Sequence, residues 1–159
     1  EVCMARLENP NGTYFDLRPI SYQFPDGDDS LNWLNIKLHA NDGNYVWKAV
    51  DPAFENFELT ALIKWLRQLA NNEPVTSLAF YATEPSVEFK ARKTQDRFKL
   101  TVSLGYEFLP PPLRNQKGSY QKRVNLAFQD DGENILAFAA DLEKELEPFP
   151  VRKERDDDP

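Results

Sequence analysis

The sequence predicts an α+β fold, mainly antiparallel β-sheet with about seven to eight strands and two amphipathic helices packed on it. Short apolar alternations with a period of two recur along the chain, and turn residues such as Asn-Gly and Asp-Gly separate them. Two longer segments place apolar residues at helical spacing. Strands that alternate in this way have one buried and one wet face, which is typical of antiparallel sheets.

The first part of the chain predicts a run of strands. Val2–Leu7 is a short strand, and Asn9-Pro-Asn-Gly12 is a turn. The next alternation changes phase near Pro19, where a bulge or bend at Arg18-Pro19 keeps both apolar halves on the core. Trp33–Ala40 and Tyr45–Val50 flank a Gly-containing turn, which predicts a hairpin.

The first helix is predicted at roughly Phe57–Asn71. Asp51-Pro52 predicts a helical turn before it, because Asp caps helices and Pro is favoured at the first helical position. The apolar residues of the helix form one face, which must lie on a sheet. These residues are Leu59, Leu62, Ile63, Leu66 and Ala70.

The rest of the chain predicts further strands and a second helix. The strands are Ser77–Ala82, Val87–Ala91, Phe98–Phe108 and Tyr120–Phe128. Asp130 and Glu133 resemble a capping box, so the second helix begins there and runs to about Glu147. Its core face comprises Ile135, Ala139, Leu142 and Leu146.

The 159 residues fit one domain, which we assign to residues 1–151. Residues 152–159 are charged and are predicted to form a flexible tail, since no apolar residue follows Val151. No stretch approaches the ~18 consecutive apolar residues of a membrane span. The single cysteine, Cys3, excludes an internal disulfide. We therefore expect a cytoplasmic protein without a membrane segment.

The net charge is −7, from 26 acidic and 19 basic residues. Nucleic-acid binding depends on Lys and Arg that neutralise phosphates, so this charge argues against nucleic acid as the direct partner. It favours a basic partner. Moderate negative charge that simply keeps a small domain soluble is the alternative interpretation.

Catalytic and metal-binding patterns are poor. His39 is the single histidine and Cys3 the single cysteine, which is too few for a Cys/His zinc site and leaves few nucleophile arrangements. No glycine-rich phosphate loop is present. We therefore predict a protein that binds a partner and is not an enzyme, with no cofactor and no metal. A hydrolase based on two carboxylates stays open, because the two residues can come from any two strands.

Two features suggest contact surfaces. Trp33 and Trp47 are out of phase with the main apolar rows of their strands, so a helix or a partner is expected to cover them. The loop Leu109–Ser119 begins with three prolines and is either a stiff connection or a polyproline ligand. A general adaptor or ligand-binding domain that uses this loop is the alternative function.

Several landmarks follow one another in the order of a known family. They are Tyr22-Gln-Phe-Pro25, Asn32-Trp-Leu-Asn-Ile36, Asp51-Pro52, Glu58-Leu59 to Trp65-Leu66, Glu84-Pro85 and Phe149-Pro150-Val151. Together they resemble the WapI-type immunity proteins from Phe15 to Val151. The resemblance implies a bacterial antitoxin, a cytoplasmic protein that binds the C-terminal toxin domain of a secreted, contact-delivered protein. In the namesake of the family, that toxin domain cleaves tRNA.

A nuclease toxin needs a basic groove for its phosphate-rich substrate, so an acidic inhibitor can cover that groove. We predict that Asp26, Asp28 and Asp29 contribute to the acidic surface, with Asp51 and Glu55 as second candidates. A solvated turn is the alternative for the three loop aspartates, which lack the remaining ligands of a calcium loop. The sequence makes no prediction of the oligomeric state.

Overall fold

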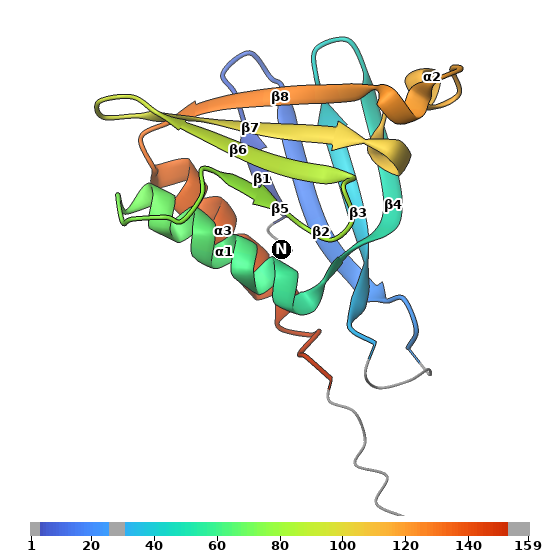
Figure 1. The fold of residues 1–159 in the computed structure, drawn as a ribbon, viewed down its shortest axis with the longest axis horizontal. Coiled ribbons are helices and arrows are strands. Elements are labelled where there is room, and N and C mark those ends of the chain that lie inside the picture. Colours follow the sequence, from blue (N-terminus) through green and yellow to red (C-terminus); the bar gives the residue numbers. More distant parts are fainter. Residues whose placement is uncertain (1–3, 26–30, 153–159) are drawn as a thin grey trace, which may run out of the picture.

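The computed structural model describes residues 4–25 and 31–152. Within these residues, two antiparallel sheets of four strands each lie face to face, and two long helices run side by side along one open edge (Figure 1). The predicted class is confirmed, with the refinement that the strands divide into two sheets. Residues 153–159 of the predicted tail lie outside the described residues.

The first sheet is a meander in the order β1-β2-β3-β4. Its strands are β1 (Ala5–Glu8), β2 (Tyr14–Tyr22), β3 (Trp33–Asn41) and β4 (Val46–Glu55). The β3–β4 turn forms because the Asp42 carboxylate accepts hydrogen bonds from the main-chain N–H groups of Asn44 and Tyr45, and Gly43 takes a φ of +92°. The predicted hairpin is therefore confirmed.

The predicted irregularity of β2 is confirmed, one residue later than expected. The register with β3 shifts between Pro19 and Ser21, so Ile20 is the extra residue and is 41% exposed. A second shift occurs in β4, where Asp51-Pro52 continues the strand. The predicted helical turn at this place is wrong, because the following Ala53 and Phe54 are buried and keep the chain on the sheet.

The second sheet is also a meander, in the order β5-β6-β7-β8. Its strands are β5 (Ala79–Tyr81), β6 (Val87–Lys93), β7 (Phe98–Gly105) and β8 (Arg123–Asp130). The strand predicted over 98–108 ends early, because Tyr106–Phe108 forms a 3-10 turn, η1. This turn buries Phe108, whose carbonyl accepts a hydrogen bond of 2.9 Å from the Trp47 indole N–H.

The proline run between β7 and β8 contains a short helix and does not form the extended polyproline conformation that the sequence left open. Pro111–Arg114 forms the short helix α2, with proline at its first positions, and Ser119–Gln121 forms a second 3-10 turn, η2. The polyproline interpretation is therefore wrong for this segment. The turn η2 also explains why β8 begins at Arg123 and not at Tyr120.

Both predicted helices are present as α1 (Asn56–Ala70) and α3 (Glu133–Leu146). Asp130 stabilises the start of α3, since its carboxylate accepts a hydrogen bond of 2.9 Å from the N–H of Ile135. Gly132, with a φ of +115°, lies directly against the end of α1. A Cβ there would come within 2.9 Å of the Ala70 carbonyl oxygen.

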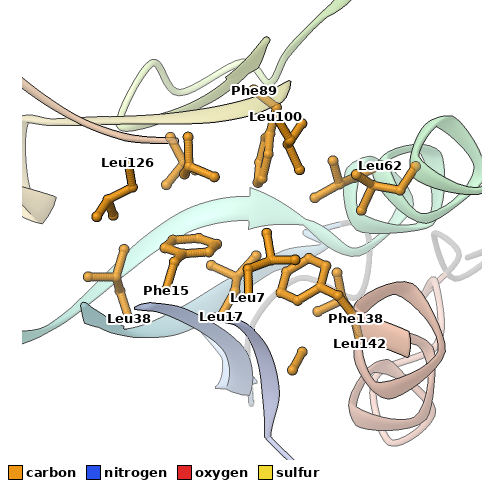
Figure 2. Close-up of a cluster of buried hydrophobic side chains, with 14 of the residues drawn as sticks. Leu7, Phe15, Leu17, Leu38, Leu62, Phe89, Leu100, Leu126, Phe138 and Leu142 are labelled. Atoms are coloured by element: carbon orange, nitrogen blue, oxygen red, sulfur yellow. The ribbon is translucent and has the colours of Figure 1, made fainter. Parts of the chain in front are cut away.

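The core lies between the two sheets and the two helices (Figure 2). Phe15 of β2 contacts Phe89 of β6 edge-on, with ring centroids 6.2 Å apart, and Phe138 of α3 at 6.3 Å. One side chain thus touches both sheets and a helix.

The two tryptophans of the first sheet differ in environment. Trp47 faces the core and is 5% exposed, whereas Val46 and Val50, on the opposite face, are 64% and 55% exposed. The prediction that Trp47 lies on the face opposite to the apolar row of its strand is therefore wrong. The same prediction is confirmed for Trp33, which is half-buried on the face opposite to the buried row of β3.

Candidate functional site

Of the predicted site residues, Asp51 and Glu55 fall within the described part of the chain. Asp26, Asp28 and Asp29 lie outside the described residues. Asp51 and Glu55 belong to the same strand, β4, and Asp51 lines a surface depression that does not include Glu55.

Glu55 lies at the junction between β4 and α1. Its main-chain N–H donates to the Glu58 carboxylate at 3.0 Å, and the other oxygen of that carboxylate accepts from the N–H of Thr83 at 2.7 Å. Glu58 thus fastens the start of α1 to the turn before β6. Burial raises the pKa of the Glu55 carboxyl, and the neighbouring Glu58 raises it further.

Asp51 lines a depression of about 430 Å³ that we call the acidic depression. Its lining residues come from β4, from the β5–β6 turn and from η1. They are Asp51, Pro52, Glu84, Pro85, Ser86, Tyr106 and Glu107. Sequence reasoning singled out Asp51 but did not assign Glu84 or Glu107 to a site.

The carboxylates of Asp51, Glu84 and Glu107 have no ion-pair or hydrogen-bond partner in the part of the chain that the structure describes. Burial raises the pKa of the Asp51 carboxyl, and the negative charges of Glu107 and Glu84 raise it further. The depression therefore holds like charges close together, and no Lys or Arg of the described residues forms part of its lining.

Tyr106 forms part of the same lining and is 43% exposed. Its backbone has a φ of +54°, in the left-handed region that is uncommon for residues other than glycine. This conformation lets the chain turn from β7 into η1, which brings Glu107 next to the β5–β6 turn. Sequence alternation alone gives no signal for the turn.

A second group of residues fastens the end of the chain, and we call it the C-terminal clasp: Tyr22, Asn32, Asn56 and the segment 149–152. The Asn32 side chain accepts a hydrogen bond from the N–H of Arg152 at 2.7 Å and donates to the carbonyl of Arg152 at 3.2 Å. The Asn56 amide donates both to Asn32 and to the carbonyl of Phe149.

Aromatic contacts complete the clasp. Tyr22 meets the ring of Phe149 edge-on at 5.6 Å and donates its hydroxyl proton to the carbonyl of Pro150. The Arg152 guanidinium lies 3.9 Å from the centre of the Tyr22 ring and donates to the carbonyls of Phe24 and Leu31. Landmarks far apart in the sequence therefore meet at one end of the molecule.

A third polar cluster lies on the outer face of the first sheet. Asp16 is 1% exposed, and its carboxylate accepts two hydrogen bonds from Arg6, at 2.6 and 2.8 Å. His39 is half-buried, and its Nε2 lies 2.9 Å from the Tyr14 hydroxyl. Burial lowers the pKa of the His39 imidazole, and the negative charge of Asp16 partly offsets this effect. Among the described residues, no three His, Cys, Asp or Glu side chains are placed so that together they could hold a metal ion.

The model of the immunity protein WapI-like family matches residues 6–150. The chain belongs to this family. The match includes all of the acidic depression and all of the C-terminal clasp except Val151 and Arg152. It makes toxin immunity the functional class of the chain. No curated protein and no solved structure matches the sequence. In the described residues of this WapI-like protein, no helix is long and apolar enough to cross a membrane.

Proposed function

We propose that this WapI-like protein protects its cell by binding and neutralising a cognate toxin domain in the cytoplasm, without catalysing a reaction. The family match over residues 6–150 is the observation that carries this proposal. The toxin belongs to a secreted protein that neighbouring cells deliver by contact.

We further propose that the toxin is a basic nuclease, such as a tRNA-cleaving enzyme. An enzyme that holds a polyanion needs a positive groove, and this chain carries a net charge of −7. Opposite charges on the two proteins accelerate their encounter and favour a complex that covers the groove. The inhibitor thereby competes with the RNA for the same surface.

The acidic depression is the described surface that best fits this role. Its three carboxylates have no partner in the described residues, so binding a cation breaks no existing ion pair. Glu55 lies further along β4 and, being half-buried, is assigned to the edge of the same interface. Asp26, Asp28 and Asp29 remain proposed contacts outside the described residues.

Co-expression tests the function. A strain that produces the toxin domain encoded directly upstream of this gene should stop growing, and the present chain should restore growth and purify with the toxin as a complex. An unrelated acidic protein of similar net charge is the control. If growth is not restored although both proteins are produced, the proposed immunity function is wrong.

The nuclease assignment needs its own measurement. The isolated toxin domain should degrade tRNA, and a stoichiometric amount of the present chain should suppress the cleavage. Replacement of Asp26, Asp28 and Asp29 by asparagine should weaken binding and reduce its dependence on salt concentration. A toxin that leaves tRNA intact, while still inhibiting growth, refutes the nuclease assignment and leaves the immunity function standing.

A further inference from the structure

We propose that the acidic depression receives one arginine side chain of the partner, with the guanidinium between Asp51, Glu84 and Glu107. This inference rests on the proposed function, because the cognate toxin supplies the arginine. Beyond that function, the inference names one contact and the type of side chain that makes it.

The arrangement of the carboxylates is the first argument. The chain brings Asp51 from β4, Glu84 from the β5–β6 turn and Glu107 from η1 to one concave surface. Like charges held together destabilise one another, and a cation among them removes that cost. A concave site also excludes more water around a bound cation than a flat surface does, which strengthens the attraction.

Ser86 supplies an independent argument. The residue lines the depression and is 3% exposed, and its hydroxyl has no hydrogen-bond partner among the described residues. Its main-chain carbonyl is already engaged by the N–H of Gly105 at 3.0 Å. The Ser86 hydroxyl stays accessible to solvent, so it can accept a hydrogen bond from a donor that enters the depression.

Arginines of the chain itself border this region but are engaged elsewhere. Arg123 donates to the Ser103 hydroxyl at 2.6 Å and to the carbonyl of Pro85 at 2.9 Å. Arg114 donates to the main-chain carbonyl of Glu107 at 3.1 Å, which leaves the Glu107 carboxylate available. Neither of these described arginines supplies the cation, which we therefore assign to a partner.

The surroundings favour arginine over lysine. A guanidinium has five N–H donors in a planar fork, which suits several carboxylates and a hydroxyl at once, whereas an ammonium has three donors. Tyr106, 43% exposed on the lining, offers a ring on which a guanidinium stacks. A guanidinium thus offers the depression more donors than an ammonium does, together with a flat face for Tyr106.

The first experiment does not involve the toxin. N-acetyl-arginine amide is titrated into the isotope-labelled protein, and backbone amide shifts are followed by NMR. Saturable shifts at Ser86 and Tyr106 are expected, with a dissociation constant on the order of millimolar for so small a ligand. N-acetyl-citrulline amide, which has the same shape without the charge, should give none.

Variants locate the binding. The double variant Glu84→Gln with Glu107→Gln should lose the saturable shifts. A matched pair, Asp96→Asn with Glu133→Gln, removes the same charge from exposed positions outside the depression and should keep them. Equal shifts with arginine and citrulline, or unchanged shifts in the double variant, would overturn the proposal.

The second experiment uses the toxin complex. The Glu84→Gln and Glu107→Gln double variant should bind the toxin about tenfold or more weakly, and the matched pair should bind within about twofold of the native chain. Replacement of one toxin arginine by lysine should weaken the binding of the toxin to the native chain. The same replacement should leave the binding of the toxin to the double variant unchanged. If the native chain binds and protects while no arginine shows this coupling, the inference fails and the proposed function stands.

Discussion

Replacement of Asn32 by alanine should loosen the C-terminal clasp. The Asn32 side chain is 7% exposed and takes part in at least three hydrogen bonds, two with the main chain of Arg152 and one with the Asn56 amide. A net contribution of about 1 kcal/mol per hydrogen bond gives a loss of about 3 kcal/mol as an upper value. Water reaches the partly buried Arg152 groups and recovers part of this, so we expect a loss of about 2 kcal/mol.

The assay is urea unfolding, followed by tryptophan fluorescence. The matched control is Asn35→Ala in β3, the strand that begins directly after Asn32. The Asn35 side chain donates one hydrogen bond of 3.0 Å to the Ser21 hydroxyl, so its loss should cost about 1 kcal/mol or less. Hydrogen exchange should also become faster at the N–H of Arg152 in the Asn32 variant and stay unchanged in the control. Equal destabilisation by the two changes, with no faster exchange at Arg152, would refute the reasoning.

Two further predictions concern buried groups. Burial raises the pKa of Glu145 to about 7 from an ordinary value of 4.5, although Arg18 opposes the rise. The folded state therefore holds a proton that the unfolded state loses, and stability falls as the pH rises from about 5 to about 7. Glu145→Gln should remove this fall, so the melting temperature of the variant relative to that of the native chain should rise as the pH increases from about 5 to about 7. A difference in melting temperature that stays constant over this pH range would contradict the assignment. Phe15→Ala should cost about 3–5 kcal/mol in urea unfolding and Phe15→Leu clearly less, because the ring joins both sheets to α3; a cost below about 1 kcal/mol for the alanine change would contradict this role.

The elements of the fold were largely predictable because their signals are local. Apolar alternation and turn residues identify the strands, and the helical faces follow from spacing. The prediction was wrong where tertiary packing overrides a local signal. Asp51-Pro52 has the chemistry of a helix start, yet the burial of Ala53 and Phe54 keeps this segment in β4. The division into two sheets depends on contacts such as Phe15 with Phe89, which no local pattern reveals.

The candidate site was predictable only in part. Asp51 is a candidate from the sequence alone, whereas Glu84 and Glu107 come next to it only through the β5–β6 turn and η1. Glu107 falls on the polar side of an apparently continuous strand, so its pattern is that of a solvated residue. The positive φ of Tyr106 redirects it, and a tyrosine at that position carries no sequence signal for the left-handed region.

The landmarks that resemble the family have different structural roles. Tyr22, Asn32 and the segment 149–151 form the C-terminal clasp, and Glu58 fastens α1 to the β5–β6 turn. These contacts hold the scaffold together. The Asp51-Pro52 and Glu84-Pro85 landmarks instead carry their acidic side chains to the acidic depression. Each proline fixes φ beside an acid that faces solvent, which positions charge at little entropic cost. Discrimination between toxins is therefore expected from residues such as Tyr106 and Glu107, which border these fixed acids and lie outside the landmarks.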